Sequence, residues 1–194
     1  MGQPKAWLPF GPERLLQRLV RQVSLAVSPV LVVSATDQDL PSVDVPIVRD
    51  SAPDCGPLEG LATGLKALQG QVDAAFVTSC DVPFLRPTLI RRLIELLDDR
   101  WACVPRIDGR WHPLTAVYRL EALEIALQML AAGQRRMIDL VQSLPTRIVE
   151  AVELRDVDPT LASFRNVNTP EDYASALREF ALVCQPDDAS ARSS

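Results

Sequence analysis

One short stretch of this sequence, Ala74–Pro83, limits most strongly what the chain can fold into. It begins as an apolar run and turns polar toward its C-terminal end. The run is too brief for a helix and is typical of a buried strand. It leads to Asp81, and Pro83 stops strand pairing because proline has no backbone N–H to donate. In open α/β sheets, ligands bind beyond the carboxyl ends of the strands, where a carboxylate can hold Mg²⁺ against substrate phosphates. We therefore expect Asp81 to be a metal ligand at a binding site; the alternative is that it caps the helix beginning near Pro87.

The length and composition fit one folded domain. The chain has 194 residues, of which 47% are hydrophobic and 23% are charged, and these values are near the average of globular proteins. Its net charge of −5 and pI near 4.9 provide no basic surface for nonspecific nucleic-acid binding. We expect no nucleic-acid partner. A phosphate-bearing ligand would be bound by individual cationic side chains, backbone amides and metal.

Cysteine spacing and hydropathy indicate the compartment. The four cysteines are scattered without a C-x-x-C pair, so neither a zinc site nor a disulfide framework is expected. No apolar run is long enough to span a bilayer, and the N-terminus has no secretory signal. We expect a protein of the reducing cytoplasm that does not associate with membranes.

Apolar periodicity predicts that helices and strands alternate along the first hundred residues. The predicted elements are a helix from Pro12, strands at 30–33 and 45–48, a helix from Gly56 to Gly70, the strand at 74–78 and an amphipathic helix from Pro87. Alternation of this kind favours an α/β fold with a mostly parallel sheet and helices on both faces.

The second half of the chain predicts a small departure from this alternation. Strands at 101–104 and 114–118, with a turn at Asp108-Gly109 between them, indicate an antiparallel pair. Further elements are predicted as helices at 121–132 and 135–141, a weak strand at 148–154, and a last helix with Thr169 as its N-cap and Pro170 in its first turn. Residues 185–194 are polar and small, and we expect a disordered tail there.

Several short motifs follow one another across nearly the whole chain. They are Met1-Gly2-x-Pro4-Lys5, Arg49-Asp50-Ser51, Gly56-Pro57-Leu58-x-Gly60, Cys80-Asp81-x-Pro83-Phe84-Leu85, His112-Pro113, Gly133-x-Arg135-Arg136 and Asn166-Val167-Asn168-Thr169-Pro170. Each is weak alone, but their joint order closely resembles the molybdenum cofactor guanylyltransferase family (MobA-like proteins), whose members join the GMP part of GTP to molybdopterin. The resemblance implies a three-layer, Rossmann-like nucleotidyltransferase fold. It also implies a monomer that uses Mg²⁺, GTP and molybdopterin and meets molybdoenzymes or cofactor-handling proteins.

The resemblance assigns catalytic roles to Asp81 and Lys5. In nucleotidyl transfer, the attacking phosphate approaches the α-phosphorus of GTP while pyrophosphate leaves, so negative charge must be offset. Asp81 would carry Mg²⁺, and Lys5 would bind phosphate as a point charge. Asp50 would be a second acidic group at the nucleotide, near the metal or on the ribose or base. Spacing alone leaves Lys5 equally open to being a solvated loop lysine.

Other motif residues would bind the rest of the nucleotide and the pterin. The resemblance places the guanine against Gly56, Pro57 and Gly60, a segment that otherwise reads as an ordinary helix start. Ser34 stands where the family places an asparagine that contacts the nucleotide, and this departure weakens its assignment. The residues expected on the molybdopterin side are His112, Arg135, Arg136, Asn166 and Asn168. Solvated charges are the alternative for the arginine pair, and Asn168 has the metal as an alternative partner.

The front of the sequence departs from the family. Family members begin with an apolar strand and a Leu-Ala-Gly-Gly loop ahead of the Met-Gly-x-x-Lys piece, and this sequence begins inside that pattern. We therefore expect a single domain over residues 1–184 that lacks its first strand, with weak GTP binding and apolar side chains exposed by the gap. One hypothesis is that Met1 is an internal methionine of a longer reading frame; an in-frame stop codon just upstream of Met1 would contradict it.

Two other functions are consistent with these residues. One is a related nucleotidyltransferase, such as a cytidylyltransferase that makes the cytosine form of the cofactor. The other is a non-catalytic module that binds molybdopterin and has lost the nucleotide half. Comparing protection by GTP and by CTP separates the enzymes, and titration with GTP and Mg²⁺ separates both from the module.

Overall fold

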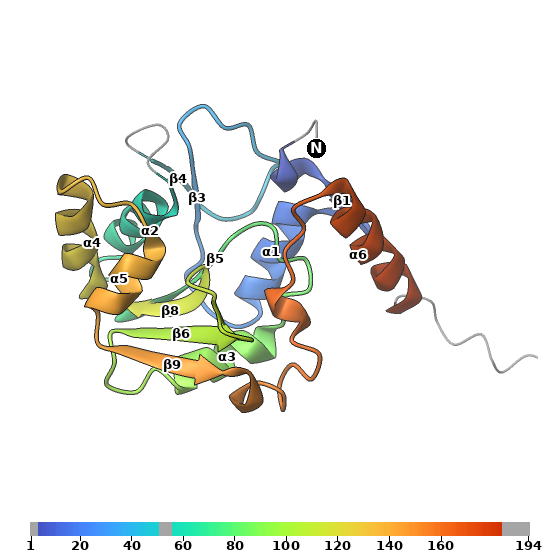
Figure 1. Cartoon of the computed structure of the whole chain (residues 1–194). Coiled ribbons are helices and arrows are strands. Elements are labelled where there is room, and N and C mark those ends of the chain that lie inside the picture. The colour runs from blue at the N-terminus through green and yellow to red at the C-terminus, as the bar shows by residue number, and fades with distance from the viewer. Residues whose placement is uncertain (1–3, 51–55, 184–194) are drawn as a thin grey trace, which may run out of the picture.

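The computed structural model describes residues 4–50 and 56–183. The expected tail at 185–194, the Met1-Gly2 motif, Ser51, Cys55 and Cys184 lie outside this range. Figure 1 gives the arrangement of the described elements.

The N-terminal part forms a short helical turn and a small hairpin before its first long helix. These elements are η1 (Lys5–Trp7), β1 (Pro9–Phe10), β2 (Glu13–Arg14) and α1 (Leu15–Ser24). The prediction that this helix begins at Pro12 is wrong, because Gly11 and Pro12 form the turn between β1 and β2. Gly11 has a φ of +67°, and a Cβ there would lie 2.4 Å from the Phe180 ring, so this turn requires glycine.

The middle of the chain follows the predicted order. Its elements are β3 (Val32–Ser34), β4 (Ile47–Arg49), α2 (Gly56–Ala67), β5 (Ala74–Thr78) and α3 (Pro87–Glu95). β3 pairs with β4 in parallel. α2 lies close against β3. A Cβ atom added to Gly64 of α2 would lie only 3.3 Å from the Cγ2 atom of Val33.

The second half completes the larger sheet. Its elements are β6 (Ala102–Ile107), β7 (Arg110–Trp111), β8 (Thr115–Arg119), α4 (Ala122–Ala131), α5 (Met137–Ser143), β9 (Thr146–Glu150), η2 (Ala151–Glu153), η3 (Ala162–Phe164) and α6 (Pro170–Val183). The sheet is mixed: β8 runs antiparallel to both β5 and β6, and β9 runs parallel to β6. Its antiparallel share is therefore larger than the small excursion expected, since the short connection from β6 to β8 cannot cross over to make a parallel pair.

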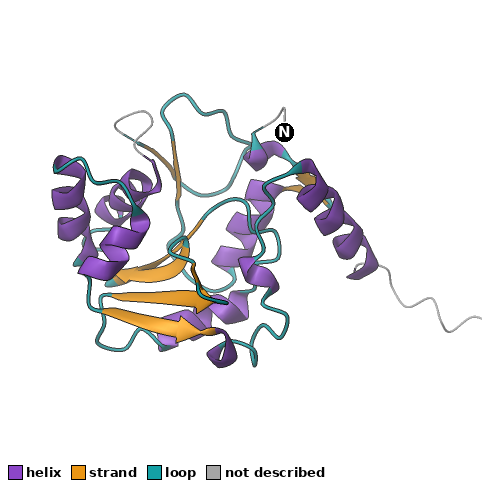
Figure 2. Ribbon diagram, viewed as in Figure 1, coloured by secondary structure: helices purple, strands orange, loops and turns teal. Residues whose placement is uncertain are grey.

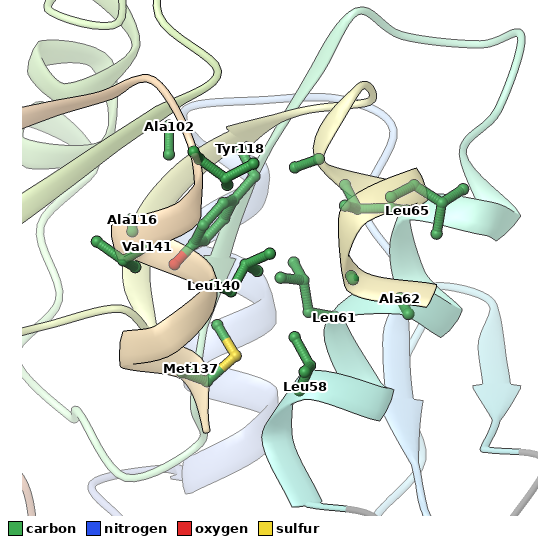
Figure 3. Packing of buried hydrophobic residues seen from close by; sticks show 14 of the residues in the cluster. Leu58, Leu61, Ala62, Leu65, Ala102, Ala116, Tyr118, Met137, Leu140 and Val141 are labelled. Carbon is green, nitrogen blue, oxygen red and sulfur yellow. The ribbon is translucent and has the colours of Figure 1, made fainter. Parts of the chain in front are cut away.

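Helices cover both faces of the larger sheet, as predicted. Alternate residues of β5 pack on opposite sides: Ala75 and Val77 join a core with α2, α4 and α5, while Ala74 and Phe76 join a core with α1 and α3. Figure 3 shows the first core, where Leu58 and Leu61 of α2 lie opposite Met137 and Leu140 of α5. The α/β fold with helices on both faces of its sheet is confirmed.

β3 and β5 do not pair with each other. Among the described residues, β3 pairs only with β4, and β5 pairs only with β8. Both strands line an apolar cavity of about 670 Å³, and Figure 2 shows the β3–β4 pair standing apart from the larger sheet. All five residues of β5 are consequently only half-buried. The sheet was expected to lack its first strand; in the described residues, β3 and β5 are separated by this cavity and belong to two different sheets.

No helix in residues 4–50 or 56–183 is both long and apolar enough to cross a membrane.

The packing of α5 predicts a large loss of stability for one substitution. Leu140 is 0% exposed, whereas Leu127 on α4 is 47% exposed. We expect Leu140→Ala to lower the free energy of unfolding by about 2–5 kcal/mol, because it removes buried methyl groups and leaves a cavity. The same change at Leu127 should cost less than about 1 kcal/mol. Urea unfolding of the two variants measures both values, and equal losses would contradict the packing described.

Candidate active site

The Asp81 carboxylate is the centre of a polar cluster beyond the C-terminal end of β5. Its Oδ2 atom accepts hydrogen bonds from Lys5 Nζ at 3.2 Å and from Asn166 Nδ2 at 3.1 Å. Its Oδ1 atom accepts one from the Ser79 hydroxyl at 2.5 Å. Asp81 therefore does not cap α3, and it lies beside Lys5 just beyond the end of β5.

At this cluster, Lys5 also connects the N-terminal turn η1 to the segment before α6. Its Nζ atom also donates to Asn168 Oδ1 at 2.7 Å. Asn168 directly precedes a capped helix start, in which Asp172 Oδ2 accepts from the backbone N–H groups of Asn168 and Thr169, and the Thr169 hydroxyl accepts from Asp172 N–H. These N–H groups lower the pKa of Asp172. The predicted cap at Thr169 is confirmed, and it fixes Asn168 beside Lys5.

The side-chain oxygens at the cluster fit a magnesium ion that is shared with a substrate. Within residues 4–50 and 56–183, no three His, Cys, Asp or Glu side chains gather into a metal-binding group. Mg²⁺ commonly needs only one or two carboxylates when substrate phosphates complete its shell. The Asp81 and Asn168 side chains offer oxygens of the type it prefers, and Asp81 keeps 13% of its side chain exposed.

The end of β3 is tied to β4 rather than open. Ser34 is buried, and its hydroxyl accepts a 2.6 Å hydrogen bond from Arg49 Nη1. The same Arg49 nitrogen donates to the backbone oxygens of Ala35 and Gln38. Arg49 thus holds the turn after β3, and it supplies the Ser34 hydroxyl with a partner inside the protein.

Asp50 lies directly after β4, and its backbone N–H donates a hydrogen bond to Ser34 O at 2.9 Å. Burial is the main reason that its pKa is raised; nearby Glu59 raises it further, while a hydrogen bond with Thr63 lowers it. Its Oδ1 atom is buried and has no hydrogen-bond partner among the described residues. A buried acceptor without a partner is costly, so a ligand N–H or O–H at this point would be favoured.

The predicted guanine segment forms the first turn of α2. Gly56 has a φ of +74° and Gly56 and Pro57 are exposed, whereas Gly60 faces Val33 of β3 at ordinary packing distance. Gly60 therefore has a packing role of its own. The exposed Arg135 and Arg136 precede α5, whose first residue Met137 lies beside Leu58 (Figure 3).

His112 lies in the connection between β7 and β8. Its ring lies against Phe164, with centroids 4.9 Å apart, and its backbone is held by Pro105 O and Thr115 N–H. Burial and the charge of Arg110 lower its pKa, so the ring is neutral at pH 7. Leu114, two residues after His112, connects this segment to the cluster, because its backbone oxygen accepts a hydrogen bond from Ser79 N–H. This placement suits an orienting group better than a proton donor.

Cys80, which adjoins Asp81, is a half-buried thiol. Burial, and secondarily the Asp81 charge, raise the pKa of its thiol, so it stays protonated at neutral pH. Cys103, in β6, is buried, and burial raises its pKa to about 12. Both are free thiols.

Sequence reasoning missed several groups around Asp81. Ser79 is its closest partner and Ser163 helps to hold the loop that follows, yet an isolated serine has no pattern that identifies it. Asn166, predicted for the pterin, contacts Asp81, and Asn168, predicted for the pterin or the metal, contacts Lys5.

Comparisons with known proteins agree with the resemblance found in the sequence. Residues 1–148 match the model of the MobA-like NTP transferase domain. A probable molybdenum cofactor guanylyltransferase of Carboxydothermus hydrogenoformans is 30% identical over 182 residues, covering 94% of this chain and 91% of the relative. One from Mycobacterium marinum is 34% identical over 183 residues, covering 92% of this chain and 87% of the relative.

Solved structures show the same fold. Molybdopterin-guanine dinucleotide biosynthesis protein A of Archaeoglobus fulgidus superposes with a TM-score of 0.78 at 20% identity, over 93% of this chain and 92% of the other. The 2-C-methyl-D-erythritol 4-phosphate cytidylyltransferase of Thermus thermophilus gives a TM-score of 0.71 at 20% identity, over 93% and 95%. These likenesses establish the fold. One of the two structures is named for a guanine dinucleotide and the other for cytidylyl transfer, so the fold alone does not indicate the base.

The environment of His112 predicts a pH-dependent component of stability. Because its pKa is lowered in the folded protein, the unfolded chain takes up a proton first as the pH falls through the ordinary value of 6.5. This component is therefore complete above that value and is lost as the pH drops below it. We expect the free energy of unfolding to fall more steeply from pH 7 to pH 5 in the wild type than in His112→Gln, measured by urea unfolding. Parallel curves would show that the ring titrates normally.

Proposed function

Because this chain belongs to the family of MobA-like NTP transferases, we propose that it transfers GMP from GTP to the phosphate of molybdopterin. The products are the guanine dinucleotide form of the cofactor and pyrophosphate. The observation that carries the proposal is the contact of Lys5 with Asp81 and Asn168 at the end of β5. The curated relatives named above are guanylyltransferases, which favours GTP over CTP and an enzyme over a binding module.

Asp81 and Lys5 would act on the phosphates. Asp81 would hold Mg²⁺, which when bound neutralises charge on the phosphate oxygens of GTP. Lys5, now on the same carboxylate, would turn its Nζ atom to those oxygens and stabilise the charge that develops at the α-phosphorus. Ser79 and Asn166 would keep the Asp81 carboxylate in a fixed orientation while Lys5 changes partner. No proton acceptor is required, because the attacking phosphate is already anionic.

The nucleoside would lie between β4 and α2. The unpaired Oδ1 atom of Asp50 suits the N–H groups of guanine or a ribose hydroxyl, and exposed Gly56 and Pro57 would lie against the ring. Ser34 and Gly60 would support this pocket through their contacts with Arg49 and Val33. Their assignment as direct nucleotide contacts stays a prediction.

Molybdopterin would approach from the side of His112, Asn166 and Asn168. His112, neutral and held against Phe164, would orient the pterin. Arg135 and Arg136 stay predicted ligands of the pterin phosphate. We further propose that the protein acts in the cytoplasm as a monomeric single domain, and that it hands its product to molybdoenzymes or cofactor-handling proteins.

The role of Asp81 predicts a large loss of activity on its removal. We expect Asp81→Ala to reduce formation of the guanine dinucleotide from GTP, Mg²⁺ and molybdopterin on the order of 100-fold, since charge stabilisation in the transition state is lost. Chromatography of the product measures the rate.

The matched control is Asp73→Ala, which removes an exposed carboxylate ahead of β5, at its other end; it should retain wild-type activity. Replacing GTP with CTP should give little product. Wild-type rates in Asp81→Ala would exclude the proposed site, and preference for CTP would favour the cytidylyltransferase.

A further inference from the structure

A buried carboxylate lies outside the cluster that surrounds Asp81. Asp158, in the chain between β9 and α6 (dark orange in Figure 1), is 0% exposed. Its Oδ1 and Oδ2 atoms accept hydrogen bonds from the backbone N–H groups of Ala162 at 3.2 Å and Ser163 at 2.9 Å. Arg86 Nε lies 3.4 Å from Oδ1. A charge this deeply buried is costly unless it is fully partnered, so Asp158 depends on these groups, and they depend on it.

Asp158 holds a strained turn that presents Ser163. Leu161 has a φ of +54°, a left-handed conformation that costs a branched residue about 1–2 kcal/mol. The two N–H groups that Asp158 binds follow directly after Leu161 and begin η3. Ser163, itself 0% exposed, accepts a hydrogen bond from Arg86 N–H at 3.1 Å and donates one to Phe84 O at 3.4 Å. The turn is therefore hydrogen-bonded to the end of the loop that leads from Asp81 to α3.

The same segment also grips the start of that loop. Asn166 Nδ2 donates to Asp81 Oδ2 at 3.1 Å, and Val167 N–H donates to Asp81 O at 2.8 Å. Segment 158–168 is therefore bonded to loop 81–86 at both ends. Because only two residues separate Ser163 from Asn166, a shift of the η3 turn would move the partners of Asp81 with it.

We propose that Asp158 and Ser163 are positioning residues that fix the Asp81 carboxylate, acting through Asn166 and Val167. Both residues are fully buried, so they would act without contacting a substrate. The catalytic consequence rests on the function proposed above for Asp81, but the mechanical link does not. Groups that orient a metal-binding side chain from behind typically matter by about 10–100-fold in affinity or activity.

The experiment measures the link and its consequence separately. Hydrogen exchange of the Val167 amide reports whether the bond to Asp81 O persists. In the full chain, we expect Asp158→Asn to accelerate this exchange at least about tenfold. The asparagine side chain has one oxygen and one NH₂ group, so it can accept a hydrogen bond from only one of the two N–H groups in the same arrangement. Ser163→Ala should act in the same direction. Amides of β6 and β9 should keep wild-type rates below the unfolding transition.

Leu140→Ala serves as the matched control for lost stability, since Leu140 lies in the core on the other face of the sheet. At a temperature where all variants remain folded, it should leave Val167 exchange unchanged relative to β6. In the GMP-transfer assay, Asp158→Asn should lower kcat by about tenfold with little change in KM for GTP, while Leu140→Ala should retain the wild-type kcat.

Unchanged Val167 exchange in Asp158→Asn would overturn the proposal. Faster exchange with an unchanged kcat would also overturn it, because segment 158–168 would then serve stability alone. If Asp81→Ala retained activity, the proposed function would fail, whereas the exchange measurement would still decide whether Asp158 holds Asp81.

Discussion

The Asp81 carboxylate brings together segments that are far apart in the chain. Lys5 lies 76 positions before it and Asn166 lies 85 positions after it, and both donate to the same Oδ2 atom. A carboxylate accepts several hydrogen bonds at once, and a lysine ammonium donates up to three, so this pair can join an N-terminal turn, a strand end and a C-terminal segment. The elements that reach the site, η1, β5 and the segment before α6, meet through these contacts.

The gap between β3 and β5 gives the proposed nucleotide-binding part a different physical character from the cluster around Asp81. Backbone groups on facing strand edges normally pair, and here the two strands instead border an apolar cavity. The β3–β4 pair is held mainly by α2, through the close contact of Gly64 with Val33, and by Arg49 across the turn. We therefore expect Asp50 and Ser34 to move more readily relative to Asp81 than Lys5 and Asn166 do.

Much of the fold could be predicted from local patterns, and most of the errors have one cause. The periodicity at 87–97 and the cap at Thr169 predicted α3 and α6 because those signals are local. The start of α1 was misplaced because the hairpin at Gly11 depends on Phe180, which is distant in sequence. For the site, the position of Asp81 after a strand was informative by itself, and Lys5 required the family resemblance. Ser79, Asp158 and Ser163 carried no signal, because their roles arise only from contacts made in the folded chain.

The central claim is that Asp81 holds a divalent cation against the phosphates of a nucleoside triphosphate. A crystal grown with GTP and Mn²⁺, as an anomalous scatterer in place of Mg²⁺, tests it most directly. The account predicts an anomalous peak in contact with the Asp81 carboxylate and a phosphate oxygen, with Lys5 Nζ on the phosphates. A bound GTP–Mn²⁺ complex whose metal lies away from Asp81, with the Lys5 contact to Asp81 intact, would contradict it.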